Sequence, residues 1–178
     1  MLKKILITIS VIVVLFFAFV LMQSNEFQVT RSIKITASVD KVFNYVNTQT
    51  KWEEWSPWAQ LDPNAEKFFG GQISGVGSFY KWSGNEKIGA GTSTIIESKE
   101  NEFIKFRLDF EKPMRTTNIA EFSFIRMEKE GETIVTWNIY GEKNFMAKLF
   151  GLFMNCEEMV GDEFEKGLKN LKEVVERS

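Results

Sequence analysis

The chain has 178 residues, of which 44% are hydrophobic and 14% aromatic, enough for one domain with a substantial core and too many for intrinsic disorder. The formal net charge is −2 and no basic patch stands out, so we expect no nucleic-acid partner. Histidine is absent, which excludes Ser-His-Asp and Cys-His nucleophiles and H-E-x-x-H zinc sites, and a single cysteine excludes an intrachain disulfide. The sequence indicates no metal site and no cofactor.

The first segment is a membrane signal. Residues 5–22 are 18 consecutive residues that are apolar except for Thr8 and Ser10, and Lys3 and Lys4 precede them. As a helix this run is about 27 Å long, close to the thickness of a bilayer core. No A-x-A-like cleavage site follows, which favours a retained single-pass anchor, residues 1–25, over a signal peptide. The two lysines predict a cytoplasmic N-terminus and a folded domain on the extracytoplasmic side.

From residue 26 the apolar residues alternate with polar ones, which is typical of a strand over 26–36. Ser38 then precedes a short helix over 39–46, and a second short helix over 50–55 is expected to end before Pro57. Further strands are separated by short turns, so we expect an antiparallel meander. The predicted strands cover 67–69, 77–83, 89–98, 102–112, 118–129 and 133–142. In residues 102–112 one face is apolar and the other charged, so one face of the sheet meets water.

The last segment, residues 155–177, reads as one amphipathic helix with Asn155 and Glu158 in a capping-box arrangement. Its predicted buried stripe centres on Phe164 and contains the apolar residues around that position: Cys156, Val160, Leu168, Leu171, Val174 and Val175. Ion pairs at i,i+4 are expected on the outer side, at Glu165/Lys169 and Glu173/Arg177.

Gly161 and Gly167 flank this stripe, and each costs about 1 kcal/mol relative to alanine inside a helix. Close packing of the helix on a strand explains them best, and close approach of a ligand is the alternative.

Several short motifs occur in a fixed order along the chain. They are Val42-Phe43-x-Tyr45-Val46, Trp52-x-x-Trp55-Ser56-x-Trp58, Gly75-Val76-Gly77-Ser78, Trp82-Ser83-Gly84-Asn85 and the Met159 to Lys172 part of the last helix. Together they resemble the START-like (SRPBCC) superfamily, in particular bacterial polyketide-cyclase/dehydrase-like proteins. The resemblance implies an α+β helix-grip domain over 26–178, in which a curved antiparallel sheet of about seven strands wraps round the long C-terminal helix. It also implies a mostly apolar cavity between sheet and helix, but no particular chemistry.

The candidate ligand-binding residues are six apolar or aromatic side chains expected to face that cavity: Trp82, Phe106, Phe122, Trp137, Val160 and Phe164. Trp52, Trp55 and Trp58 are expected at the cavity entrance or on a surface beside the membrane. Glu157 fits either a carboxylate at the cavity end or a first-turn acid that satisfies the helix dipole. No carboxylate pair or Ser/Lys spacing stands out, so no catalytic residue is assigned.

These observations favour a membrane-anchored binding module for a hydrophobic small molecule, such as a lipid, an isoprenoid or a polyketide-like compound. One alternative is a cyclase or dehydratase that acts on such a ligand with acids in the pocket. The other is a non-catalytic envelope protein with a filled core and a structural or partner-binding role. An open apolar cavity separates the first two readings from the third, and two titrating groups aimed into it separate the enzyme from the binder.

Overall fold

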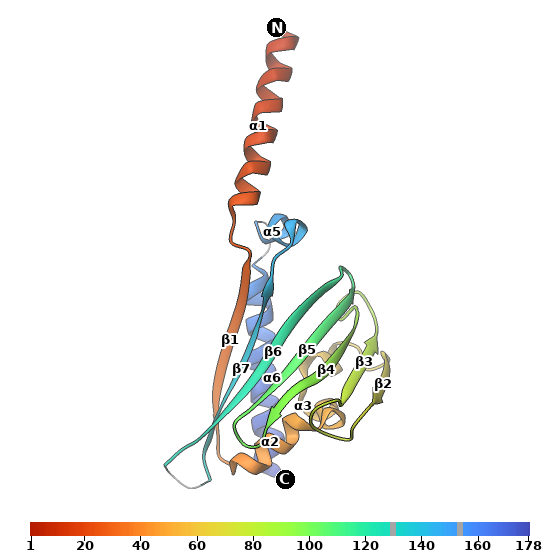
Figure 1. The fold of residues 1–178 in the computed structure, drawn as a ribbon, viewed down its shortest axis with the longest axis vertical. Helices are drawn as coiled ribbons and strands as arrows, with labels where there is room; N and C mark the ends of the chain where they lie inside the picture. Colours follow the sequence, from red (N-terminus) through yellow and green to blue (C-terminus); the bar gives the residue numbers. More distant parts are fainter. Residues whose placement is uncertain (129–130, 153–154) are drawn as a thin grey trace.

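The computed structural model describes residues 1–128, 131–152 and 155–178, without the side chain of Cys156. The helices are α1 Leu2–Met22, α2 Val39–Asn47, η1 Gln49–Lys51, α3 Trp52–Trp55, α4 Pro57–Leu61, α5 Phe145–Gly151 and α6 Cys156–Arg177. The strands are β1 Glu26–Ile35, β2 Glu66–Gly70, β3 Phe79–Ser83, β4 Ala90–Lys99, β5 Phe103–Lys112, β6 Thr116–Arg126 and β7 Thr133–Glu142. The long helix α1 extends away from the rest of the chain at one end of the molecule (Figure 1).

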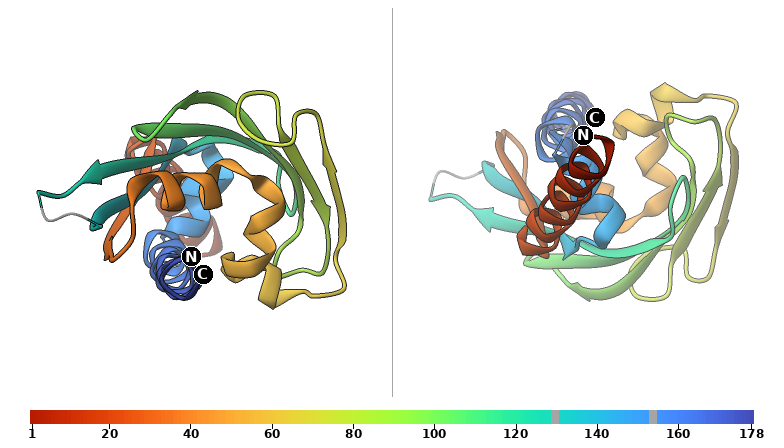
Figure 2. Two further views of the ribbon diagram at one scale, coloured as in Figure 1. Left: turned by 90° about the horizontal axis from the view of Figure 1, so that it is seen from below. Right: turned by 90° about the horizontal axis from the view of Figure 1, so that it is seen from above.

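The described strands form one antiparallel sheet in the order β1-β7-β6-β5-β4-β3-β2. The neighbours β2 to β7 follow one another in the chain because their turns are short, and β1 completes the sheet by pairing with β7. Seen along the long axis, the sheet curves round the helices, and α6 lies inside the curve (Figure 2). The prediction of a seven-stranded antiparallel sheet packed on a long C-terminal helix is confirmed.

The buried face of α6 follows the predicted stripe. Phe164, Leu168, Leu171 and Val175 are all buried in the core. At the start of the helix, the Asn155 side-chain oxygen accepts a hydrogen bond from the Glu158 backbone N–H at 3.2 Å. The Glu158 carboxylate reaches back to the Asn155 side-chain amide at 2.8 Å rather than to its backbone. The side chain of Cys156, which belongs to the predicted stripe, lies outside the description.

One of the predicted helix ion pairs forms as expected, because Arg177 Nη2 lies 3.2 Å from Glu173 Oε2. Glu165 forms its ion pair with Arg31 on β1, at 2.8 Å, and so connects α6 to the edge of the sheet.

The two glycines of α6 serve close packing. A side chain at Gly161 would overlap the Arg31 guanidinium, which crosses the helix at this point. A Cβ at Gly167 would lie 2.9 Å from the Trp137 ring and 3.0 Å from Pro57 Cδ. Side chains, rather than strand backbone or a ligand, therefore occupy the space that the glycines leave.

The short helices differ in detail from the prediction. The single helix expected over 50–55 is a 3₁₀ turn, η1, followed by α3, and the chain leaves the helix at Ser56 with ψ 128°. Pro57 then begins α4, a position that suits its fixed φ angle and missing N–H. The sequence pattern does not predict α4 or α5.

The strand boundaries agree to within two residues, except that β6 ends at Arg126, three residues before the predicted end. Gly75 and Gly77 have positive φ angles of 74° and 87°, so the chain turns there and β3 begins only at Phe79. The predicted end of the sixth strand at Lys129 and the turn at Glu130 lie outside the described residues.

Candidate functional site

Four of the six predicted ligand-binding residues meet in one aromatic cluster between the sheet and α6. Phe106, Phe122, Trp137 and Phe164 are each at most 2% exposed. Trp137 stacks on Phe164 with ring centroids 4.0 Å apart, and Phe122 lies 4.6 Å from Trp137 and 6.0 Å from Phe106. Val160 is partly buried and packs against the same core. The sequence pattern thus identified one contiguous region of the interior.

Trp82 lies apart from this cluster. Its ring is 5.7 Å from Tyr80 and 5.8 Å from Phe110, and its indole N–H donates to the Ile88 carbonyl at 3.0 Å. Burial, together with the nearby Glu53 carboxylate, raises the pKa of Tyr80 to about 12. Tyr80 therefore stays protonated near neutral pH, which makes its hydroxyl a hydrogen-bond donor and not a base.

The three tryptophans expected at the entrance complete the aromatic cluster. Trp52 lies 5.1 Å from Phe106, and Trp55 lies 5.7 Å from Trp137. Trp58 is 5.5 Å from Trp137. The alternative that they rest on the membrane is wrong, because α3 lies at the end of the domain away from α1 (Figure 1) and Trp55 is fully buried.

Two indole N–H groups in this cluster are buried without a hydrogen-bond partner among the described residues, those of Trp55 and Trp137. The side-chain oxygen of Gln49 is also buried without a hydrogen-bond partner among the described residues, whereas its amide nitrogen donates to the Ser93 carbonyl at 3.3 Å. A buried polar atom without a partner costs about 1–3 kcal/mol. The interior therefore offers two donors and one acceptor to any polar atom that enters it.

A groove of about 1,010 Å³ opens at the end of the domain nearest α1. It lies between α5, the adjoining ends of β1, β6 and β7, and the start of α6. Its apolar wall is formed by Phe27, Pro113, Met114, Met146, Ala147, Phe150 and Leu152. Phe27 also packs against the core, so the groove ends on the same interior that holds the aromatic cluster. Viewed along the long axis, α5 lies within the curve of the sheet (Figure 2).

Polar groups line one part of this groove. Lys143 Nζ lies 2.9 Å from Glu157 Oε1, and Asn144 caps α5 by accepting a hydrogen bond from the Ala147 N–H at 2.8 Å. Asn118 adds a side-chain amide on β6. Glu157 lines this groove and is also an acidic residue in the first turn of α6, and its charge is paired with a lysine.

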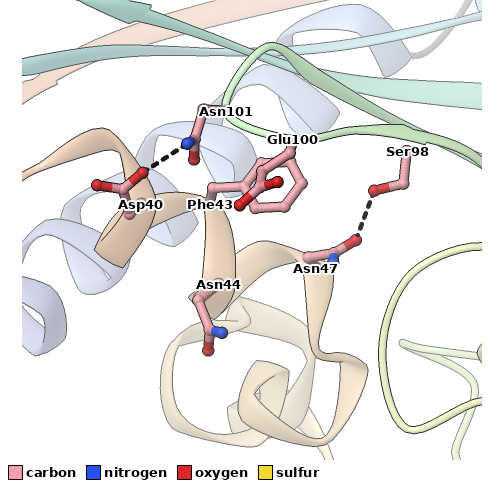
Figure 3. A pocket seen from close by; sticks show the side chains of 7 residues that line it. All are labelled: Asp40, Phe43, Asn44, Asn47, Ser98, Glu100 and Asn101. Carbon is pink, nitrogen blue, oxygen red and sulfur yellow. Dashed lines mark hydrogen bonds between the residues drawn. The ribbon is translucent and has the colours of Figure 1, made fainter.

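A second, smaller recess of about 390 Å³ lies between α2 and the turn after β4 (Figure 3). The Asn101 amide donates to Asp40 at 2.5 Å, and Ser98 Oγ donates to the Asn47 side-chain oxygen at 2.9 Å. These two hydrogen bonds leave the Asn101 side-chain oxygen buried without a partner among the described residues. Among the described residues, neither this recess nor the groove is lined by any of the six predicted residues, and no cluster of acidic or sulfur ligands able to hold a metal is found.

The sequence profile of the family described as polyketide cyclase / dehydrase and lipid transport matches residues 26–176. The chain belongs to this family. The match begins where β1 begins and ends within the last turn of α6, so it covers the whole sheet and leaves out α1. No match was found among curated proteins.

Several solved structures share the fold of this chain. MLL2253 from Mesorhizobium loti superposes with a TM-score of 0.62 at 11% identity, covering 85% of this chain and 98% of the other. A protein from Thermobifida fusca gives 0.63 at 17% identity, with 84% and 93% coverage. Ara h 8.0201 gives 0.58 at 9% identity, with 86% and 99% coverage. At these identities the likeness establishes the fold alone.

The groove is the part of this family member's candidate site that the sequence pattern missed. Its signal was present in residues 144–152: an Asn that can cap a helix is followed by apolar side chains at 145, 146, 149 and 150. That segment reads as a link between the last strand and the last helix because it is short. Only the fold brings it over the end of the sheet.

Proposed function

We propose that this family member is a membrane-anchored binding module for a hydrophobic small molecule, a lipid or a compound of lipid, isoprenoid or polyketide type. In this proposal residues 1–25 are the anchor and residues 26–178 the binding domain. The observation that carries it is the apolar groove of about 1,010 Å³ at one end of the sheet and helix interior. Binding sites for small molecules typically have volumes of about 300–1,000 Å³ and mostly apolar walls.

The aromatic cluster supports a deeper part of the same site. Because Phe27 connects the groove to the core, a long ligand extends inward toward Phe106, Phe122 and Trp137, with Val160 and Phe164 on the helix side. The unpaired Trp55 and Trp137 N–H groups suit a carbonyl, a hydroxyl or a water molecule at the inner end. Trp82 forms the far wall in this proposal.

The anchor proposal is supported by the composition and surroundings of α1. This helix is long and apolar enough to cross a membrane, and nearly all of it is exposed to solvent in the isolated chain. Val20, the residue of α1 that is buried, lies near its C-terminal end. With Lys3 and Lys4 before the apolar run, the positive-inside tendency favours a cytoplasmic N-terminus and an extracytoplasmic domain.

The enzyme alternative is less well supported by the groove. Proton transfer needs an acid or base aimed at the ligand. Two carboxylates line the groove: Glu142 is exposed to solvent, and Glu157 is held by Lys143. The close packing of the aromatic cluster supports the alternative of a structural protein with a filled core. It does not explain an apolar groove of this volume.

The experiment uses the full-length chain in phosphatidylcholine nanodiscs and the apolar fluorescent probe 1-aminoanthracene. Ala147 lines the groove and is half-buried, so Ala147→Trp fills space there. Ala59 is also half-buried on a short helix but lies outside the groove lining, so Ala59→Trp is the matched control. We expect Ala147→Trp to weaken saturable probe binding at least tenfold and Ala59→Trp to change it less than twofold.

Native mass spectrometry of the same material separates the alternatives. A co-purified apolar compound that is recovered unaltered supports the binding module. Recovery of a chemically changed compound favours the cyclase or dehydratase. Absence of both saturable probe binding and co-purified compound in a folded protein overturns the binding proposal and favours the structural one.

A further inference from the structure

Helix α5 packs on the last turns of α1. Phe145 stacks on Phe17 with ring centroids 5.9 Å apart, and Lys148 Nζ donates to the Leu21 carbonyl oxygen at 3.1 Å. Val20 and Lys148 are buried at this junction. The last carbonyls of a helix have no partner within it, and the helix dipole favours a cation there. These contacts fix the height of α5 relative to α1.

That height follows from the positions along α1. The apolar run 5–22 is about 27 Å long as a helix, close to the roughly 30 Å of a bilayer core. Phe17 precedes Met22 by five residues, so its backbone lies about 9 Å below the membrane boundary when the run is centred in the bilayer core. The Phe145 ring centroid is 5.9 Å from that of Phe17, so the Phe145 ring lies within about 6 Å of this depth. Helix α5 itself lies at the end of α1 nearest the sheet (Figure 1), so it is at the membrane boundary when α1 spans the membrane.

The side chains around this junction suit that depth. Met146, Phe150 and Leu152 are 43%, 50% and 36% exposed, and Met159 at the end of the first turn of α6 is 55% exposed. Helices that lie in a membrane interface bury their apolar face about 5–10 Å into the boundary between headgroups and acyl chains. An apolar surface that is continuous with a spanning helix has the bilayer as its natural partner.

We infer that α5 lies in the membrane interface and that the groove behind it opens to the bilayer, so that its ligand is a lipid taken from the membrane and not a solute. This inference rests on the proposed anchoring and binding function. Met146 and Phe150 belong both to the exposed surface and to the groove wall. Lys143 and Asn144, which also line the groove, place polar groups where a lipid headgroup would remain.

The first test measures the depth of α5 in full-length protein in phosphatidylcholine nanodiscs. Cys156→Ser removes the single native cysteine, and a nitroxide is attached to Phe150→Cys. The matched control is Ile125→Cys, because Ile125 is 58% exposed and apolar but lies near the end of β6, at the end of the domain away from α1 (Figure 1). We expect oxygen to relax the label at 150 more strongly than a water-soluble nickel chelate does, and the reverse at 125.

The second test identifies the source of the ligand. The nanodiscs carry phosphatidylcholine with a photoreactive diazirine in one acyl chain, and crosslinked residues are mapped by mass spectrometry. We expect crosslinks on Phe27 or Met114 inside the groove, and we expect Ala147→Trp to reduce them at least fivefold. Crosslinks confined to α1 and the outer side of α5 would overturn loading from the bilayer.

The outcomes separate this inference from the proposed function. A label at 150 that is as water-accessible as the label at 125, in protein that remains in the nanodisc and binds 1-aminoanthracene, overturns the inference and leaves the binding function standing. A label at lipid depth without probe binding or groove crosslinks overturns the binding function and the lipid loading, and leaves only the interfacial position of α5. Loss of the protein from the nanodiscs overturns the anchor and the inference together.

Discussion

The Trp137 ring lies flat on the Phe164 ring, with centroids 4.0 Å apart and planes 7° apart. Trp137 belongs to β7 and Phe164 to α6, so this stack joins the sheet directly to the long helix. Both rings are buried, and an aromatic pair adds about 0.5–1.5 kcal/mol to the effect of burial alone. The grip of the sheet on the helix is therefore centred on this pair.

Phe164→Ala should lower the free energy of unfolding by about 3–5 kcal/mol, because it removes a large buried side chain and leaves a cavity against Trp137. The neighbouring exposed residue provides the control. Glu165→Ala loses the ion pair with Arg31 and should cost under about 1 kcal/mol, since exposed pairs contribute little. Denaturant unfolding of the full chain in mild detergent measures both. Equal losses in the two variants would mean that α6 is not gripped through Phe164.

The two glycines of α6 should respond differently to alanine. At Gly167 the new Cβ meets the Trp137 ring and Pro57, neither of which has room to move, so we expect a loss of about 1–3 kcal/mol. At Gly161 it meets the flexible end of Arg31, which can shift. The gain of about 1 kcal/mol in helix propensity then offsets the disturbed contact, and Gly161→Ala should be close to neutral. The same unfolding measurement compares Gly161→Ala with Gly167→Ala. A larger loss of unfolding free energy for Gly161→Ala would contradict the packing at these two glycines.

Stability should fall at high pH partly through Tyr80. Burial and Glu53 raise its pKa from 10.0 to about 12, so the folded state disfavours the phenolate. The contribution is fully present below pH 10 and is lost as the pH rises from 10 toward 12, because the unfolded chain releases the proton first. Tyr80→Phe should flatten the decrease in unfolding midpoint over that range relative to the unmodified protein. An unchanged pH profile in the variant would exclude Tyr80 as a cause.

The inner part of the proposed site can be tested on one strand. Phe122 and Phe124 are both buried on β6, but Phe122 touches Trp137 whereas Phe124 packs on Phe43, farther from the groove. Leucine at either position should cost about 1–3 kcal/mol as a smaller core side chain. We expect Phe122→Leu to change 1-aminoanthracene affinity at least fivefold and Phe124→Leu less than twofold. Equal changes in affinity would confine the ligand to the groove.

The orientation in the membrane is testable with a fusion. A reporter enzyme that is active only outside the cytoplasm, joined after Ser178, should be active, and the fusion should be recovered at full length in the membrane fraction. Replacing Lys3 and Lys4 by glutamate should reduce that activity, because it removes the charge asymmetry that sets the orientation. Activity confined to the cytoplasm, or a shortened product, would contradict the anchored topology.

The sequence alone determined the features that depend on local periodicity. Alternation of apolar and charged residues along β5 placed its apolar face inward, and the stripe around Phe164 located the buried face of α6. Both patterns are clear because, in a regular helix or strand, the side chains that face the core recur at a constant spacing. The family resemblance then supplied the order in which these elements pack, and the sheet and helix agree with it.

Only the tertiary structure decided where the groove lies and what fills the interior. The sequence placed Trp52, Trp55 and Trp58 at the cavity entrance or on a surface beside the membrane. Their contacts with residues far away in the chain place them in the aromatic cluster instead. The groove forms where α5, β1, β6 and β7 meet, through residues that are distant along the chain and share no local pattern. A cavity remains where packed helices and strands leave space between them. Its position therefore depends on the side-chain volumes across the whole domain.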